Sequence, residues 1–176
     1  MPNRAKPLPT RTNKKLLMKI KTGLLTAALV ALLFASCTDG VLVHRYLPVG
    51  EDGWARTDTL SFPLPAISHE ADYAIQLGMR YGNLFPYEGI WVVAETRLHH
   101  PISLRRDTIY LVVTDEDGHT LGQGVTLNQR EVALTKLHLK KDQEGTLRLY
   151  HIMRREVIPH ITDMGICIAE RQKKAP

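Results

Sequence analysis

Cysteine is scarce in this sequence, which has only Cys37 and Cys167 among its 176 residues. A disulfide framework is therefore excluded, and Cys167 has no partner if Cys37 serves another purpose. Cys167 stands in a strand-like apolar stretch, so we expect it to be a small buried residue. Packing, not covalent cross-linking, must then hold the fold together.

Acidic residues are missing from the first 36 positions, although this segment carries seven Lys or Arg. The apolar run from Thr22 to Phe34 is about 13 residues long, well short of the ~20 that a membrane-spanning helix needs. A basic start, a short apolar run and small residues at its end are typical of a secretory signal peptide. The sequence predicts one over 1–36, with a possible alternative start at Met18. A retained membrane anchor is the other interpretation.

A single thiol follows this run directly. The stretch Phe34-Ala35-Ser36-Cys37 resembles the bacterial lipobox, in which the cysteine is lipidated and the signal is removed in front of it. Phe34 stands where that pattern prefers Leu, which is also large and apolar. We predict that lipidated Cys37 anchors the chain to a membrane, because several acyl chains bind stably where one is marginal. Residues 37–52 are then a lipidated N-terminus and a tether, or a first edge segment.

Excess positive charge is absent from the rest of the chain. Without the seven basic residues of the signal, 16 of the 23 Lys and Arg remain against 18 Asp and Glu. This balance gives no ground for expecting a basic surface of the kind that binds nucleic acid. The remaining length suits one domain with its own core. It would span 53–172, followed by a basic tail over 173–176.

Helical periodicity is also lacking. The best helical segment, Met153 to Val157, is short and is limited by Pro159. Apolar residues instead alternate with polar ones in 71–80, 108–113 and 147–151, which is typical of half-buried strands. Further strands are expected at 57–64, 90–98, 119–126, 131–139 and 164–170, and Asp117-Gly118 indicates a hairpin turn. About eight short strands predict an all-β, antiparallel β-sandwich of jelly-roll type.

Signatures of enzymes and of metal sites are absent. There is no phosphate-binding glycine loop, no G-x-S-x-G and no H-E-x-x-H. His99-His100 offers two imidazoles without an obvious third ligand. The stretch Asp115 to Gly118 resembles the start of a calcium loop, but its twelfth position is Thr126, which favours a charged turn. We therefore predict no catalytic residue, metal, cofactor or small-molecule substrate.

Aromatic residues are few, at 6% of the chain, so each one is informative. Trp91 lies within an apolar strand and is expected in the core. Trp54 and Tyr87 lie in expected loops. The segment from Tyr81 to Gly89 gathers Tyr81, Phe85 and Tyr87 around a proline. These three rings and Trp54 are candidates for binding a partner; the alternative is that the rings of this segment close one end of the core.

The order of several short motifs resembles the GldH family of gliding-motility lipoproteins in Bacteroidetes-type bacteria. The resemblance runs from Cys37 almost to the C-terminus. Gly89 stands where the family tends to have asparagine. The motifs are the lipobox, Trp54 with Asp58-Thr59, Arg80, Pro86-Tyr87, the strand 90–93, Asp107-Thr108, Asp117-Gly118 with 121–124, Met153-Arg154, and 161–166.

This resemblance implies an outer-membrane lipoprotein that gliding requires in motile relatives, where gliding is coupled to type IX secretion. It implies no catalytic residue. Three functions stay open at this point. The first is a non-enzymatic accessory that contacts other proteins of the cell envelope. The second is a glycan- or peptidoglycan-binding module that uses Trp54 and Tyr87, and the third is a hydrolase. A flat patch would favour the first function, and an aromatic cleft would favour the second.

Overall fold

The computed structural model describes residues 40–171, which form strands and loops. This part of the chain contains no helix, and so none that is long and apolar enough to cross a membrane. The ten strands are β1 (Val41–Pro48), β2 (Trp54–Ala55), β3 (Leu60–Leu64), β4 (Ala71–Gly82), β5 (Gly89–His99), β6 (Ser103–Val112), β7 (Leu127–Leu139), β8 (Glu144–His151), β9 (Val157–Ile158) and β10 (Ile161–Glu170).

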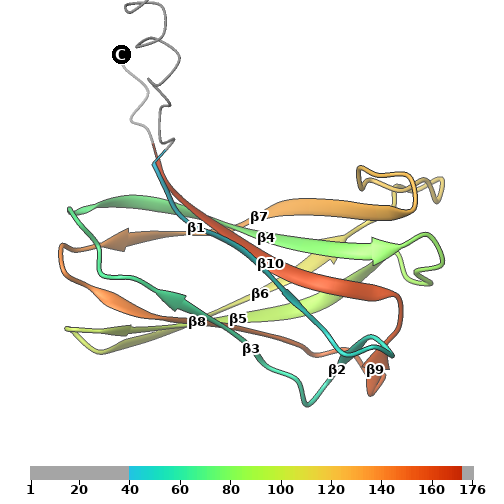
Figure 1. Ribbon diagram of the computed structural model, residues 1–176, viewed down its shortest axis with the longest axis horizontal. Coiled ribbons are helices and arrows are strands. Elements are labelled where there is room, and N and C mark those ends of the chain that lie inside the picture. Colours follow the sequence, from blue (N-terminus) through green and yellow to red (C-terminus); the bar gives the residue numbers. More distant parts are fainter. Residues whose placement is uncertain (1–39, 172–176) are drawn as a thin grey trace, which may run out of the picture. The chain divides into compact units, whose positions relative to one another are not determined.

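The strands form two four-stranded sheets, which lie as two layers in Figure 1. The strand orders are β1-β10-β4-β7 and β3-β8-β5-β6, and all of their pairings are antiparallel. Consecutive long strands mostly change sheets, as in the jelly-roll form of the sandwich. The predicted all-β sandwich is thus confirmed. The short β2–β9 ribbon lies at one end of the sandwich.

The core lies between the two sheets and follows the alternation in the sequence. In β4, Tyr73, Ile75, Leu77 and Met79 are buried, while Asp72 and Gln76 are exposed. The apolar side of the expected strands predicts nine core residues, of which eight are buried and Ile109 is partly buried against them. Those eight are Tyr73, Ile75, Leu77, Leu111, Val113, Leu147, Leu149 and Ile166. Alternation works here because each sheet has one buried face.

Three local predictions need correction. Residues 119–126 form no strand and make only isolated bridges, because Gly124 has φ 152° and turns the chain away from an extended ladder. Residues 41–48, expected as part of a tether or as a first edge segment, form edge strand β1, which pairs with β10 and covers core residues. In the helical candidate 153–157, residues 153–156 are irregular and Val157 begins β9. Cys167 is half-buried in β10, not fully buried.

Trp54 is a core residue, which corrects its prediction as a partner-binding residue in a loop. Its side chain is 0% exposed, and its indole N–H donates to the Asp58 carbonyl at 3.1 Å. The ring meets the buried His151 edge-on, with centroids 5.3 Å apart. The β2–β9 ribbon places Trp54 there, since Trp54 pairs with Ile158, which is also buried. A short ribbon of this kind leaves no periodic signal in the sequence.

Tyr46 crosses the outer face of the sheet β1-β10-β4-β7. Tyr46, Gly165, Gly78 and Glu131 are successive cross-strand partners in this sheet. The ring lies over both glycines, because a Cβ on Gly165 would approach it to 2.6 Å. Its hydroxyl donates to Glu131 Oε1 at 2.8 Å, and the Arg80 guanidinium stands 4.1 Å from the ring centroid. Because glycine has no side chain, Gly78 and Gly165 leave a trough on this face of the sheet, and the Tyr46 ring fills it.

Candidate functional site

The predicted aromatic segment forms a ladder of rings at one end of the sandwich. Tyr81 and Phe85 have centroids 5.4 Å apart, and Phe85 and Tyr87 5.5 Å apart. Tyr81 is buried, and its hydroxyl lies 2.7 Å from the Thr120 hydroxyl, so it is not free to bind a partner. Phe85 and Tyr87 are partly buried against the core. This packing favours the alternative interpretation, in which the rings close the end of the core. Cys37, the predicted lipidation site, lies outside the described residues.

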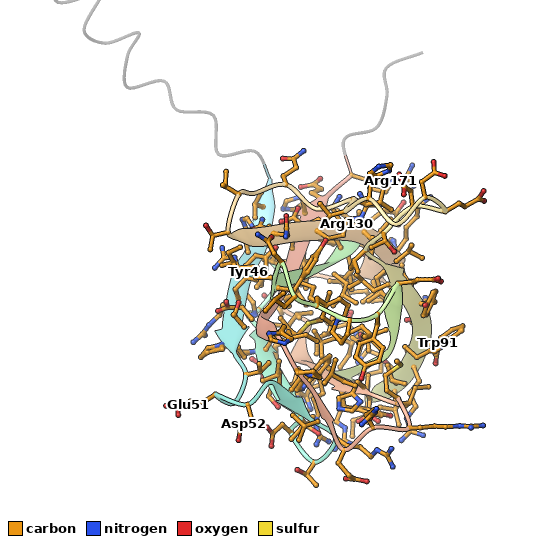
Figure 2. All side chains as sticks on the ribbon, turned by 90° about the vertical axis from the view of Figure 1, so that its right-hand side faces the viewer. Tyr46, Glu51, Asp52, Trp91, Arg130 and Arg171 are labelled. Atoms are coloured by element: carbon orange, nitrogen blue, oxygen red, sulfur yellow. The ribbon has the colours of Figure 1, made fainter. Side chains whose placement is uncertain are left out.

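Trp91 lies on the surface, which corrects the expectation that it packs in the core. Its side chain is 47% exposed and stands at the periphery of the domain in Figure 2. Trp91 pairs across the sheet with Tyr110 of β6, which is 37% exposed, and the two ring centroids are 5.1 Å apart. The run Ile90-Trp91-Val92-Val93 is apolar throughout, so its pattern could not tell the two faces of β5 apart.

A buried carboxylate lies further along the same outer face. Glu95 of β5 pairs in register with Arg106 of β6 on one side and with Arg148 of β8 on the other. Its residue is only 5% exposed. Arg106 Nε donates to Glu95 Oε2 at 2.8 Å. Arg97 Nη2 and Arg148 Nη1 lie 3.6 Å and 3.8 Å from Glu95 Oε1. Three guanidinium groups therefore surround one carboxylate.

The electrostatics follow from this geometry. The hydrogen bond from Arg106 lowers the pKa of Glu95 and outweighs burial, which alone would raise it. The same bond raises the pKa of Arg106. Glu95 is thus ionised at neutral pH and balances one of the three positive charges. The other two remain on the surface, because all three arginine side chains are about half exposed.

Between the two groups, Val93 is buried although it points away from the core. It pairs with Thr108 of β6 and Tyr150 of β8, so these neighbours cover it. The aromatic pair and the arginine cluster are thus parts of one continuous surface on β5, β6 and β8. We call it the aromatic–arginine face, and it comprises Trp91, Tyr110, Tyr150, Arg97, Arg106 and Arg148 around Glu95.

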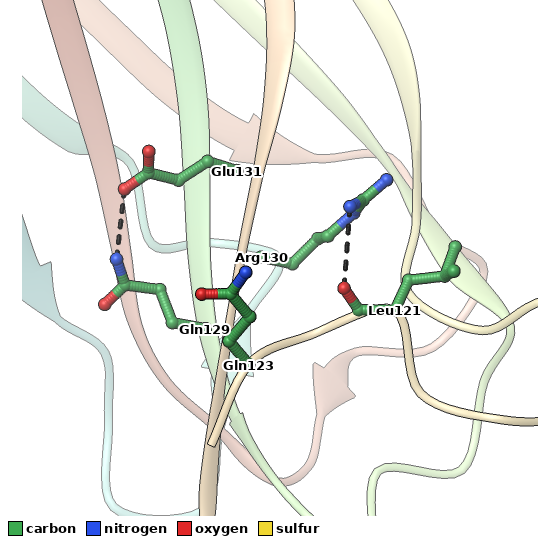
Figure 3. A pocket seen from close by; sticks show the side chains of 5 residues that line it. All are labelled: Leu121, Gln123, Gln129, Arg130 and Glu131. Carbon is green, nitrogen blue, oxygen red and sulfur yellow. Dashed lines mark hydrogen bonds between the residues drawn. The ribbon is translucent and has the colours of Figure 1, made fainter.

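Three hollows in the described part of the chain lie away from this face. The one in Figure 3, of about 470 Å³, is lined by Leu121, Gln123, Gln129, Arg130 and Glu131. Gln129 donates to Glu131 at 3.0 Å, and Arg130 reaches the Leu121 carbonyl at 3.5 Å. Such a polar groove could hold water or a polar group. Its lining contains neither a nucleophile nor a base paired with one.

The acidic turn brings Asp115, Asp117 and His119 together, with ligand atoms within 4.8 Å of one another. All three residues are exposed. The Asp115 carboxylate accepts backbone N–H bonds from Asp117 at 3.1 Å and His119 at 2.7 Å. These bonds, the one from His119 above all, lower the pKa of Asp115. The carboxylate therefore stabilises its own turn, as expected for the charged turn at Asp117-Gly118.

Comparison with known proteins identifies the family. The sequence profile of the GldH lipoproteins matches residues 41–168. The "Gliding motility lipoprotein GldH" of Flavobacterium johnsoniae is 25% identical over 168 residues, which cover 88% of this chain and 99% of that protein.

Among solved structures, a family 35 carbohydrate-binding module from Clostridium thermocellum aligns with a TM-score of 0.39 and 16% identity. The alignment covers 72% of this chain and 86% of that module. The CBM35 from Cellvibrio japonicus Abf62 aligns with a TM-score of 0.34 and 12% identity, covering 79% of this chain and 96% of that one. Likenesses of this size carry no argument about a ligand. The family profile, in contrast, spans most of the sandwich, and the chain belongs to the GldH lipoprotein family.

Proposed function

We propose that this protein is a non-enzymatic, lipid-anchored accessory of the cell envelope that acts by contacting other envelope proteins. The proposal includes lipidation at Cys37, an outer-membrane location and association with a gliding or secretion machinery of the kind that the family's name suggests. The observation that supports it best is the aromatic–arginine face. It is rich in Trp, Tyr and Arg, the residue types that contribute most of the binding energy in protein interfaces.

The face also differs from an enzyme site and from a typical sugar cleft. It lies on the outer side of a sheet, and its one buried titratable group, Glu95, is held by arginines and has no nucleophile beside it. The exposed rings of Trp91 and Tyr110 rest on strands and are not among the residues that line the described hollows. A patch of exposed aromatic and charged side chains on the outer side of a sheet suits contact with another protein.

The anchor is tested by replacing Cys37 with Ala in the full chain. We expect the variant to lose incorporation of a fatty-acid probe and to leave the membrane fraction. The label would persist in the Cys37→Ala protein if another residue carried the lipid. Separation of inner and outer membranes then tests the location, with the wild-type protein as the control.

The contact function is tested with two matched double variants in the anchored protein. Trp91→Ala with Tyr110→Ala removes the aromatic part of the face, whereas Phe85→Ala with Tyr87→Ala changes the ladder at the end of the sandwich. Partners are captured from crosslinked envelopes and identified by mass spectrometry. We expect only the first pair to lose wild-type partners. If the first variant folds and retains every partner, the face is not the contact surface.

A second measurement separates this function from glycan binding. The purified protein is titrated with defined glycans and with peptidoglycan fragments in a calorimeter. We expect no heat of binding beyond dilution. Tight binding of a glycan that Trp91→Ala abolishes would replace the accessory function by that of a binding module.

A further inference from the structure

The aromatic–arginine face carries uncompensated positive charge. Three guanidinium groups share one carboxylate, so a net charge of about two remains within one patch of the sheet. The rest of the chain after the signal is close to neutral, with slightly more acidic than basic residues. The positive charge is therefore a local property of this face and indicates a partner surface of opposite charge.

The arginines also have hydrogen-bond donors to spare. A guanidinium has five N–H donors in a rigid fork. Arg106 uses one of them for Glu95, while Arg97 and Arg148 approach Glu95 only at ion-pair distance, with no hydrogen bond to it among the described residues. Unused forks of this kind match carboxylates, which they bind through two parallel hydrogen bonds.

Glu95 holds this cluster in place. Because it is almost fully buried and bonded to Arg106, it keeps the guanidinium groups close together despite their mutual repulsion. Further along β5, four residues or roughly 13 Å away, Trp91 and Tyr110 offer an apolar surface. The face thus has two parts, one that attracts carboxylates and one that attracts an apolar or aromatic side chain.

We propose that this face binds an acidic segment of a partner protein, with carboxylates on Arg97, Arg106 and Arg148 and an apolar side chain on Trp91 and Tyr110. This inference rests on the proposed contact function and adds the chemistry of the partner. In a symmetric pair of copies, the positive face of one copy would meet the positive face of the other, which like charges disfavour.

The position of the face favours a protein partner over the membrane that carries the anchor. The described chain enters the sandwich at Gly40 and continues into β1, which belongs to the other sheet. Val41 is level with Ala169 and Ala74, whereas β5 begins beyond the far end of β4, at Gly82. Trp91 therefore lies roughly 20 Å along the strands from the point of entry. It is an exposed residue of β5, which belongs to the opposite layer (β5 in Figure 1).

The test is photocrosslinking in the living host with the full lipidated chain. A photoreactive phenylalanine replaces Tyr110, and in a control strain it replaces Gln76, an exposed residue on the outer face of the other sheet. We expect Tyr110 to crosslink to a protein segment with two or more Asp or Glu within a few residues of an apolar one. Gln76 should not crosslink to that segment.

The crosslinked segment is then synthesised and its affinity for the purified chain is measured. We expect Arg97→Gln and Arg148→Gln each to weaken binding about tenfold or more, as for the loss of a charged hydrogen bond. Neither change removes a hydrogen bond to Glu95, so both variants should fold. Arg45→Gln, which removes an exposed charge from β1, is the matched control and should change binding less than about twofold.

The outcomes separate the inference from the proposed function. A crosslinked protein segment without acidic residues, or one whose affinity ignores Arg97 and Arg148, overturns the acidic partner and leaves the contact function in place. Crosslinks to lipid or to glycan, or no crosslink at Tyr110, overturn both. A crosslink to a second copy of this chain overturns the assignment of a separate partner.

Discussion

The two outer faces of the sandwich both carry an aromatic ring, but they use it differently. On the sheet β1-β10-β4-β7, Tyr46 fills the space above Gly78 and Gly165 and donates to Glu131 at 2.8 Å. On the sheet β3-β8-β5-β6, Trp91 rests beside Tyr110 and stays 47% exposed. Tyr46 is therefore packed and bonded within its own chain, whereas Trp91 leaves an exposed aromatic surface.

The arginines of the two faces differ in the same way. Arg80 stacks on Tyr46 and also donates to Gln129 at 3.0 Å, so its planar group is engaged within the chain. Arg97 and Arg148 share Glu95 with Arg106 and retain donors for another molecule. An exposed aromatic residue therefore indicates an interface only under two conditions. The ring must not be packed within its own chain, and the charged residues beside it must keep unused hydrogen-bond donors or acceptors.

A change in the core that both sheets share should cause the largest loss in the free energy of unfolding. This loss should not depend on the side chains of either outer face. Leu111→Ala removes a fully buried side chain of the core and should lower the free energy of unfolding by about 2–5 kcal/mol. The control is Val112→Ala, since the next side chain of the same region points outward and is exposed. Urea unfolding compares the two, and equal losses would contradict the assignment of the faces.

The arginine cluster gives the second effect, which depends on pH. Glu95→Ala removes a buried carboxylate with a charged hydrogen bond, and should lower the free energy of unfolding by about 1.5–3 kcal/mol at pH 7. The folded-state pKa of Glu95 is lowered, so its stabilisation is complete above the ordinary glutamate pKa of about 4.3 and is lost as the pH falls through the lowered value. Wild type and variant should therefore converge in acid.

The control for this titration is Glu116→Ala, which removes an exposed carboxylate from the turn 114–120. Its difference from wild type should be small at every pH. A difference for Glu95→Ala that stayed constant from pH 7 down to pH 2 would show that the side chain contributes by packing and not by its charge.

The Tyr46 trough gives a smaller effect that a double-mutant cycle can isolate. Gly165→Ala places a methyl group against the Tyr46 ring and should lower the free energy of unfolding by about 1–3 kcal/mol. In a Tyr46→Ala background the same change meets no ring and should cost almost nothing. The expected coupling is about 0.5–3 kcal/mol. Additive effects would mean that the ring does not occupy this trough in solution.

The sequence predicts the two layers of this fold well, because the alternation of apolar and polar residues indicates which side of a strand is buried. It works for β4 and β8, where polar and apolar residues take turns. It fails for Trp91, because both faces of β5 are apolar nearby, and for Trp54, because a two-residue strand is too short to show a period.

The candidate site could not be predicted from the sequence, for a different reason. Glu95, Arg106 and Arg148 come from three strands, and nothing in their spacing along the chain relates them. Only the register of β6 with β5 and of β8 with β5 places both arginines opposite the carboxylate. The resemblance to the GldH family named the family correctly from scattered motifs. It gave no surface, because a family pattern does not say which residues remain unpaired.

The smallest expected effect tests whether Trp91 contributes less than Tyr46 to the stability of the fold. Trp91→Ala should lower the free energy of unfolding by about 0.5–1.5 kcal/mol, the usual worth of one aromatic pair. Tyr46→Ala should cost more, because it uncovers two glycines and removes the hydrogen bond to Glu131. Urea unfolding of both variants in the same buffer measures the difference. If Trp91→Ala were the more damaging change, Trp91 would be a structural residue, and its loss could not be used to map a binding surface. If Tyr46→Ala lowers the free energy of unfolding more than Trp91→Ala does, the loss of a partner in the Trp91→Ala variant can be attributed to the aromatic–arginine face and not to unfolding.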